Sequence, residues 1–144
     1  MGANLVDDSL RLGVEGLYAS GNDVGTGRAE GWNQLFPTGH KFLGLTDAFG
    51  ARTNVASGVV HVTYKPLAAL TLSADAHLFA RPEATTPGGP TGVAGGELDL
   101  GANYALGTGL RLWGLYGLFV PHDDFYASDE ALHYVEVELR YDLR

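Results

Sequence analysis

VEVELRYDL, the stretch from Val135 to Leu143, decides the fold of this chain. Its odd-numbered positions hold Val, Leu or Tyr, whereas its even-numbered positions hold Glu, Arg or Asp. Side chains on a β-strand point alternately to opposite faces, so a strand here would have one apolar and one charged face. A helix would distribute the same residues around its whole circumference. The stretch therefore predicts a β-strand.

The same alternation recurs upstream. Apolar residues fill every second position, with mostly polar or small residues between them, in segments 10–18, 60–65, 70–79 and 97–104. Segment 110–119 is apolar on both faces apart from Arg111. Glycine recurs inside these segments, which disfavours helices because an interior helical glycine costs about 1 kcal/mol relative to alanine. We expect an all-β, antiparallel fold with about six clear strands.

The connections between these segments alternate in length. Residues 65–68 and 106–109 are short, Pro- or Gly-containing turns, whereas 21–58, 82–95 and 121–131 are long links. Short turns at one end and long loops at the other are typical of bacterial outer-membrane β-barrels. The pattern predicts an antiparallel transmembrane β-barrel in a Gram-negative outer membrane, with the turns on the periplasmic side and the loops facing outward.

A soluble β-sandwich is the competing fold, because it also alternates apolar and polar residues along each strand. Aromatic residues near the strand ends favour the membrane instead, since barrels carry such girdles at both interfaces. Those residues are Tyr18, Tyr64, Tyr104 and Tyr141. We therefore expect the apolar face to meet lipid or detergent.

Length and composition argue against several other classes of protein. The 144 residues suit a single domain, residues 1–144, and the formal net charge of -8 argues against nucleic acid as a partner. Without cysteine there are no disulfides or thiolate metal sites. The longest uncharged stretches are shorter than the ~20 apolar residues of a spanning helix. No basic and apolar leader follows Met1, so for an outer-membrane protein we expect a mature chain whose signal peptide has been removed or replaced.

Closure of the barrel is the main open point, because unpaired backbone groups are costly in lipid and single-chain bacterial barrels have about 8 strands or more. Two more strands would have to come from the long link, one of them from Lys41 to Ala48. On this reading the chain is an eight-strand monomer. The alternatives are a barrel shared between copies, as a homo-oligomer, and a six-strand portion of a larger barrel.

Several local strings resemble the C-terminal part of the alginate export family of outer-membrane β-barrels. They are YASGND (Tyr18 to Asp23), QLFPTGHKFLGLTD (Gln34 to Asp47), GELDL (Gly96 to Leu100) and LFVP (Leu118 to Pro121). The resemblance implies a passive conduit for an exopolysaccharide or another small polar solute, with no cofactor and no covalent chemistry. It also implies that Leu35 to Asp47 belongs to an extracellular-side loop, so that Thr38, His40, Lys41 and Asp47 would line the pore mouth.

The polar faces of the strands supply the remaining candidate binding residues. They are expected to line the interior and are Arg11, Glu15, Lys65, Asp75, His77, Arg81, Asp99, Arg111, Glu136, Glu138 and Arg140. Glu97 and Asp142 point the same way. This mixture is not the strongly basic lining expected for an acidic polysaccharide. In a barrel of ~8 strands such side chains would fill the interior, so a plugged barrel that serves as a structural or surface-binding module is the second reading.

The sequence gives weaker evidence for metal binding or catalysis. His61, His77 and Asp75 would share a metal only if all three converged, and histidines in such places more often join hydrogen-bond networks. The acidic string His122-Asp123-Asp124, with Asp129 and Glu130 behind it, matches no calcium-loop spacing. Ser73 and His77 lie about 13 Å apart along one strand, too far for a nucleophile–base pair. An outer-membrane hydrolase is therefore the third reading, and we expect neither enzyme activity nor a bound metal.

Overall fold

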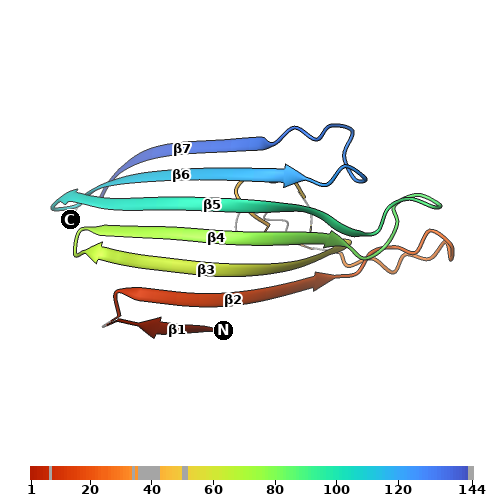
Figure 1. Cartoon of the computed structure of the whole chain (residues 1–144), viewed down its shortest axis with the longest axis horizontal. Coiled ribbons are helices and arrows are strands. Elements are labelled where there is room, and N and C mark those ends of the chain that lie inside the picture. Colours follow the sequence, from red (N-terminus) through yellow and green to blue (C-terminus); the bar gives the residue numbers. More distant parts are fainter. Residues whose placement is uncertain (7, 34, 36–42, 50–51, 143–144) are drawn as a thin grey trace.

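A computed structural model describes residues 1–6, 8–33, 35, 43–49 and 52–142. The described residues contain seven β-strands (Figure 1), with the bounds β1 Gly2–Leu5, β2 Leu10–Ala19, β3 Val55–Leu67, β4 Leu70–Arg81, β5 Gly92–Gly107, β6 Leu110–Pro121 and β7 Leu132–Tyr141. They form one sheet in the order β1-β2-β3-β4-β5-β6-β7, and all neighbouring pairs are antiparallel. The prediction of an all-β antiparallel fold is confirmed.

Two details of the predicted topology need correction. A seventh strand, β1, precedes the six expected ones; its sequence Gly-Ala-Asn-Leu is too short to show a period. The expected closed sheet of eight strands is not found among the described residues, where β1 and β7 form the two edges. In the same part of the chain, no helix has the length and apolar character needed to cross a membrane.

The register aligns the apolar positions of successive strands, because residues directly opposite each other point to the same side of a sheet. Tyr64 lies opposite Leu72, Leu72 opposite Ala102, and Gly114 opposite Val137. We call this side the outer face. Its exposed members include Leu12, Val14, Tyr18, Val60, Tyr64, Leu72, Leu78, Leu98, Leu100, Tyr104, Leu112, Val135, Val137, Leu139 and Tyr141. For segments 10–18, 60–65, 70–79, 97–104 and 135–141, the facing is thus the one that the alternation predicts.

Turns and loops lie at opposite ends of the sheet, as expected (Figure 1). The turns between β3 and β4 and between β5 and β6 have two residues each outside the strands, 68–69 and 108–109. The long connections are 20–54, 82–91 and 122–131. They are shorter than predicted because β3 already begins at Val55 and β5 at Gly92.

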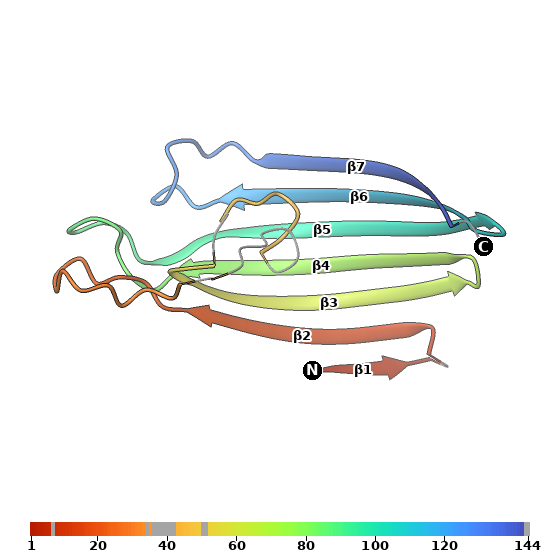
Figure 2. The same ribbon diagram turned by 180° about the vertical axis from the view of Figure 1, so that it is seen from behind.

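Part of the first long connection folds back over the sheet. Residues 43–49, called the covering segment below, lie over the side opposite the outer face, which we call the inner face (Figure 2). A strand was predicted from Lys41 to Ala48; residues 43–48 form bends and turns instead, and 41–42 lie outside the described residues. The reason is local, because Gly44 and Asp47 both have left-handed backbones, with φ of 84° and 54°, which a strand does not accommodate.

The core forms where the covering segment meets the loop end of the inner face. Leu43 and Phe49 pack there with Val55, Phe79 and Phe119. The Phe49 and Phe79 ring centroids are 4.8 Å apart, and the Phe49 and Phe119 rings meet edge to face. A sheet with only one apolar face buries little by itself, so this core depends on the covering segment.

Candidate functional site

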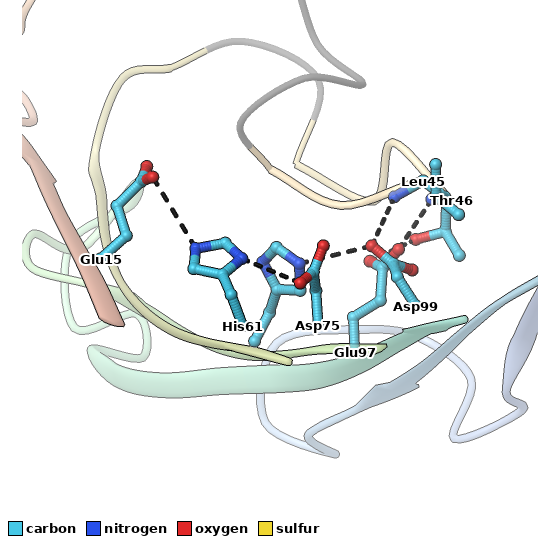
Figure 3. A network of polar contacts seen from close by, with 8 residues as sticks. Glu15, Leu45, Thr46, His61, Asp75, Glu97 and Asp99 are labelled. Atoms are coloured by element: carbon cyan, nitrogen blue, oxygen red, sulfur yellow. Dashed lines mark hydrogen bonds and ion pairs between the residues drawn. The ribbon is translucent and has the colours of Figure 1, made fainter. Parts of the chain in front are cut away.

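A band of six titratable side chains crosses the inner face near the middle of strands β2 to β5. We call it the polar belt; its members are Glu15, His61, Asp75, His77, Glu97 and Asp99. The register brings them together, because His61 lies directly opposite Asp75, Asp75 opposite Asp99, and His77 opposite Glu97. Figure 3 shows Glu97 and Asp99 on the sheet with Leu45 and Thr46 of the covering segment above them.

One half of the belt is open to solvent. The His61 Nδ1 atom lies 2.8 Å from Asp75 Oδ1, a hydrogen bond, and its Nε2 atom lies 3.8 Å from Glu15 Oε2. The three side chains are 37% to 49% exposed. Screening by water therefore weakens the attraction between these groups.

The other half of the belt is buried. His77 Nε2 lies 3.3 Å from Asp99 Oδ2, and the two side chains are only 8% and 10% exposed. His77 Nδ1 and Asp99 Oδ1 are both buried without a hydrogen-bond partner in the described part of the chain. Unsatisfied buried polar atoms are uncommon in folded proteins, so this pair distinguishes the belt from an ordinary interior network.

The covering segment is held to the belt by hydrogen bonds from its backbone and one hydroxyl. Leu45 N donates to Asp99 Oδ2 over 3.2 Å, Thr46 N to Glu97 Oε1 over 2.8 Å, and Thr46 Oγ1 to Glu97 Oε2 over 2.7 Å. Gly117 on β6 makes room for this contact: a Cβ there would stand 3.1 Å from that of Leu45. Two strand carboxylates thus act as acceptors for the segment above them.

A small cavity of about 280 Å³ remains between the segment and the sheet. Glu15, Gly44, Leu45, His61, Asp75, His77, Asp99 and Trp113 are among the residues that line it. A larger groove of about 910 Å³ runs along the neighbouring part of the inner face, beside Arg11, Glu15, His61 and Asp75. The polar belt, the covering segment and this cavity make up the candidate site.

The structure brings only some of the predicted site residues together. Glu15, Asp75, His77 and Asp99 belong to the belt, and Arg11 lines the adjoining groove. Arg140 pairs instead with Glu138 at 2.6 Å and stacks over the Trp113 ring at 4.5 Å. Glu136 accepts a hydrogen bond from Tyr134, and Arg111 lies opposite Arg140.

The other predicted residues lie away from the belt or outside the described chain. Arg81 stacks over Phe49 in the loop-end core, 5.0 Å from the ring centroid, and Lys65 is exposed near the turn after β3. Asp47 belongs to the covering segment itself. Thr38, His40 and Lys41 lie outside the described residues. The mouth assignment therefore stays a prediction.

Sequence reasoning missed the partners from the covering segment. The contacts of Leu45 and Thr46 reach across 54 and 51 residues, to Asp99 and Glu97, and no local pattern encodes such a distance. His61 was recognised as a polar-face residue, and its bond to Asp75 is the kind of network that the sequence favoured over a metal site.

Metal and nucleophile chemistry find little support in this geometry. Within the residues that the structure describes, no group of three or more His, Asp or Glu side chains is arranged to hold a metal ion. His122 and Asp124 are mostly exposed, with 3.7 Å between Nδ1 and Oδ2. Among the described residues, His77 Nε2 faces Asp99 and Nδ1 has no hydrogen-bond partner, so no His77–Ser73 hydrogen bond is found there.

Comparison with known proteins gives one match. A family model described as alginate export matches residues 7–136, nearly the whole chain, from β2 through the first half of β7. Comparisons with curated proteins and with solved structures found no match. The family match agrees with the strings from which the sequence resemblance was drawn.

Proposed function

This chain belongs to the alginate export family, and we propose that it forms wall and lumen of an outer-membrane β-barrel that passes a polar saccharide without covalent chemistry. At the level of the family, membership implies an outer-membrane protein related to exopolysaccharide export, in a family of the transport type. Beyond family membership, we propose that the sheet is part of a barrel, that its outer face meets lipid and that its inner face meets the solute.

The outer face is the observation that carries the proposal. Large apolar side chains cover this face from β2 to β7, and Val137, near the middle of the edge strand β7, is 73% exposed. Monomeric proteins in water rarely expose continuous apolar patches of this kind. Hydrocarbon would cover this face without a free-energy penalty. The charged side chains of the opposite face would contact water or one another.

Closure of the wall requires more than the seven strands. β1 has four residues and β7 has ten, so pairing these two edges would leave most of the β7 edge without hydrogen-bond partners. Each unpaired backbone group in lipid costs several kcal/mol. We therefore propose that further strands complete the barrel, and the mass of the folded species in detergent tests this. A folded species that has the mass of a single chain and leaves no strand edge unpaired would contradict it.

Conductance across a planar bilayer tests the conduit. Detergent-purified chain should insert and give stable current steps that a polar saccharide reduces as it occupies the lumen. The proposal fails if the chain stays folded and monodisperse in plain buffer without detergent, because the outer face would then have another cover.

A plugged barrel is the second candidate, and the covering segment favours it. Leu43 is fully buried and Thr46 holds the segment to Glu97, so part of the interior is filled. A plugged barrel would insert into the bilayer without conducting. The variant Gly44→Ala, which should displace the segment, would then open a current that the unmodified chain lacks.

A further inference from the structure

We propose that the free edge of β7 is a docking surface for a further β-strand, which runs from the turn end of the sheet to its loop end. This partner strand carries apolar side chains on the outer face and a basic side chain on the inner face. The inference rests on the proposed function, since it specifies the strand that continues the wall of the barrel. The state of the edge, the direction of the strands and the charges of β7 support it.

The β7 edge lacks the short length, the proline and the bulge by which free strand edges are commonly protected. The strand has ten residues, contains neither proline nor glycine, and pairs with β6 in a regular register. Its outward side chains Val135 and Val137 are 71% and 73% exposed, whereas Leu112 on the neighbouring β6 is 40% exposed. A long, regular and apolar edge of this kind pairs readily with another strand.

The direction of the partner follows from the order of the strands. Each neighbouring pair from β1 to β7 is antiparallel, so β1 and β7 run the same way, from the loop end to the turn end (Figures 1 and 2). Direct pairing of these two edges would therefore be parallel. Bacterial outer-membrane barrels have an even number of antiparallel strands. The strand beside β7 must then run from the turn end to the loop end, and closure requires an odd number of added strands.

A second copy of the same seven strands does not meet this requirement. If its loops lay on the same side of the membrane, its β1 or its β7 would run parallel to β7 of the first copy. Antiparallel pairing between two β7 edges would place the loops of the two copies on opposite sides of the membrane. The homo-oligomeric barrel considered from the sequence is therefore not the closure that we propose.

The two faces of β7 define the side chains of the partner. Directly opposed residues share a face, so the partner positions beside Val135 and Val137 are apolar. On the inner face, Glu138 is already paired with Arg140 at 2.6 Å, whereas no salt bridge to Glu136 is found among the described residues. Because opposite charges on directly opposed residues stabilise a strand pair, the partner carries Lys or Arg beside Glu136.

Disulfide trapping tests the direction directly, because the chain contains no cysteine. Single cysteines are placed at Tyr141, at the turn end of β7, or at Val135, nearer its loop end. The folded chain in detergent is oxidised with a synthetic peptide of about ten residues, the length of a transmembrane strand, which alternates valine with threonine. A cysteine at the N-terminus of the peptide should link to Tyr141→Cys, and a cysteine at its C-terminus to Val135→Cys.

The basic side chain is tested by the residue that precedes the C-terminal cysteine, because this residue lies beside Glu136 when the cysteine lies beside Val135. A peptide with lysine there should link to Val135→Cys about two- to fivefold more than one with glutamate, as expected for one cross-strand charge pair. Adding Glu136→Gln should abolish this preference. Leu112→Cys is the control, since it lies on the same outer face but β6 is paired on both sides; it should link to neither peptide.

Several outcomes would overturn the assignment: links in the reverse order, no links, links to Leu112→Cys as readily as to β7, or links between copies that carry Val137→Cys and Ala3→Cys. Equal linking of the lysine and glutamate peptides would contradict the basic side chain. Bilayer conductance separates these failures from failure of the proposed function. A chain that conducts although no peptide pairs with β7 is still a conduit. A chain that pairs in the predicted order but never inserts has the docking edge without the conduit.

Discussion

The carboxylate of Glu97 accepts two hydrogen bonds from Thr46, one from the backbone N–H at 2.8 Å and one from the hydroxyl at 2.7 Å. Glu97 is buried on β5, and its two oxygens are both used by a residue 51 positions away. This pairing turns a strand carboxylate, which would otherwise require water, into an anchor for the covering segment.

Replacing Thr46 by Val should weaken that anchor. The variant Thr46→Val keeps the shape but leaves one buried Glu97 oxygen without its donor, which costs about 1 to 3 kcal/mol. Urea unfolding in detergent measures the loss. The same exchange at the exposed Thr85 is the control and should change the free energy of unfolding by less than about 0.5 kcal/mol. Equal losses at both positions would mean that the hydroxyl does not hold the segment.

Gly44→Ala should displace the covering segment. Gly44 has a φ of 84°, and a Cβ there would overlap the Glu97 carboxylate. The control Gly88→Ala has a similar φ of 72° with open space around it, so it carries the backbone strain alone, about 1 to 2 kcal/mol. We expect faster trypsin cleavage at Arg52, next to the segment, in Gly44→Ala only. Faster cleavage in neither variant would show that the segment tolerates the overlap.

Val137→Arg tests the direction of the two faces. Val137 lies on the outer face, and a charge near mid-strand in lipid costs about 2 to 4 kcal/mol. Its neighbour Glu138 points the other way and pairs with Arg140 at an exposed site, so Glu138→Gln should be mild. Unfolding in lipid vesicles provides the comparison, and similar damage from both changes would contradict the assigned faces.

Phe119→Ala should open the core at the loop end. Phe119 is fully buried between Phe49, Phe79 and Tyr126, and truncation of a buried Phe typically costs about 3 to 5 kcal/mol. Leu132, opposite Phe119 on β7 and 48% exposed, gives the matched control. Thermal unfolding should separate the two variants clearly. A Phe119→Ala variant as stable as Leu132→Ala would place the core elsewhere.

The strands and their faces could be predicted because alternation is a local property. Val135 to Tyr141 reveals its two faces without any knowledge of its neighbours, and the register then aligns equivalent positions. β1 was missed since four residues with two small side chains carry no period. The strand predicted from Lys41 to Ala48 is not formed over residues 43–48, because Gly44 and Asp47 adopt left-handed backbones that apolar spacing does not report.

The site was less accessible from sequence than the fold. Asp75, His77 and Asp99 were expected on the inner face, and alternation placed them there. Which of them would be buried depends on Leu45 and Thr46, whose positions are determined by tertiary packing rather than by neighbours in the chain. Arg81 and Arg140 were grouped with the interior binding residues, but stacking on Phe49 and Trp113 separates them from the belt.

The shared aromatic core has a consequence for how the chain unfolds. Leu43 and Phe49 come from the covering segment, while Phe79 and Phe119 come from the sheet, and neither group is buried without the other. Segment and strands should therefore form a single cooperative unit. Amide exchange at Leu45 and at the mid-strand residues of β5 should then proceed through the same opening event, with equal protection and equal dependence on denaturant.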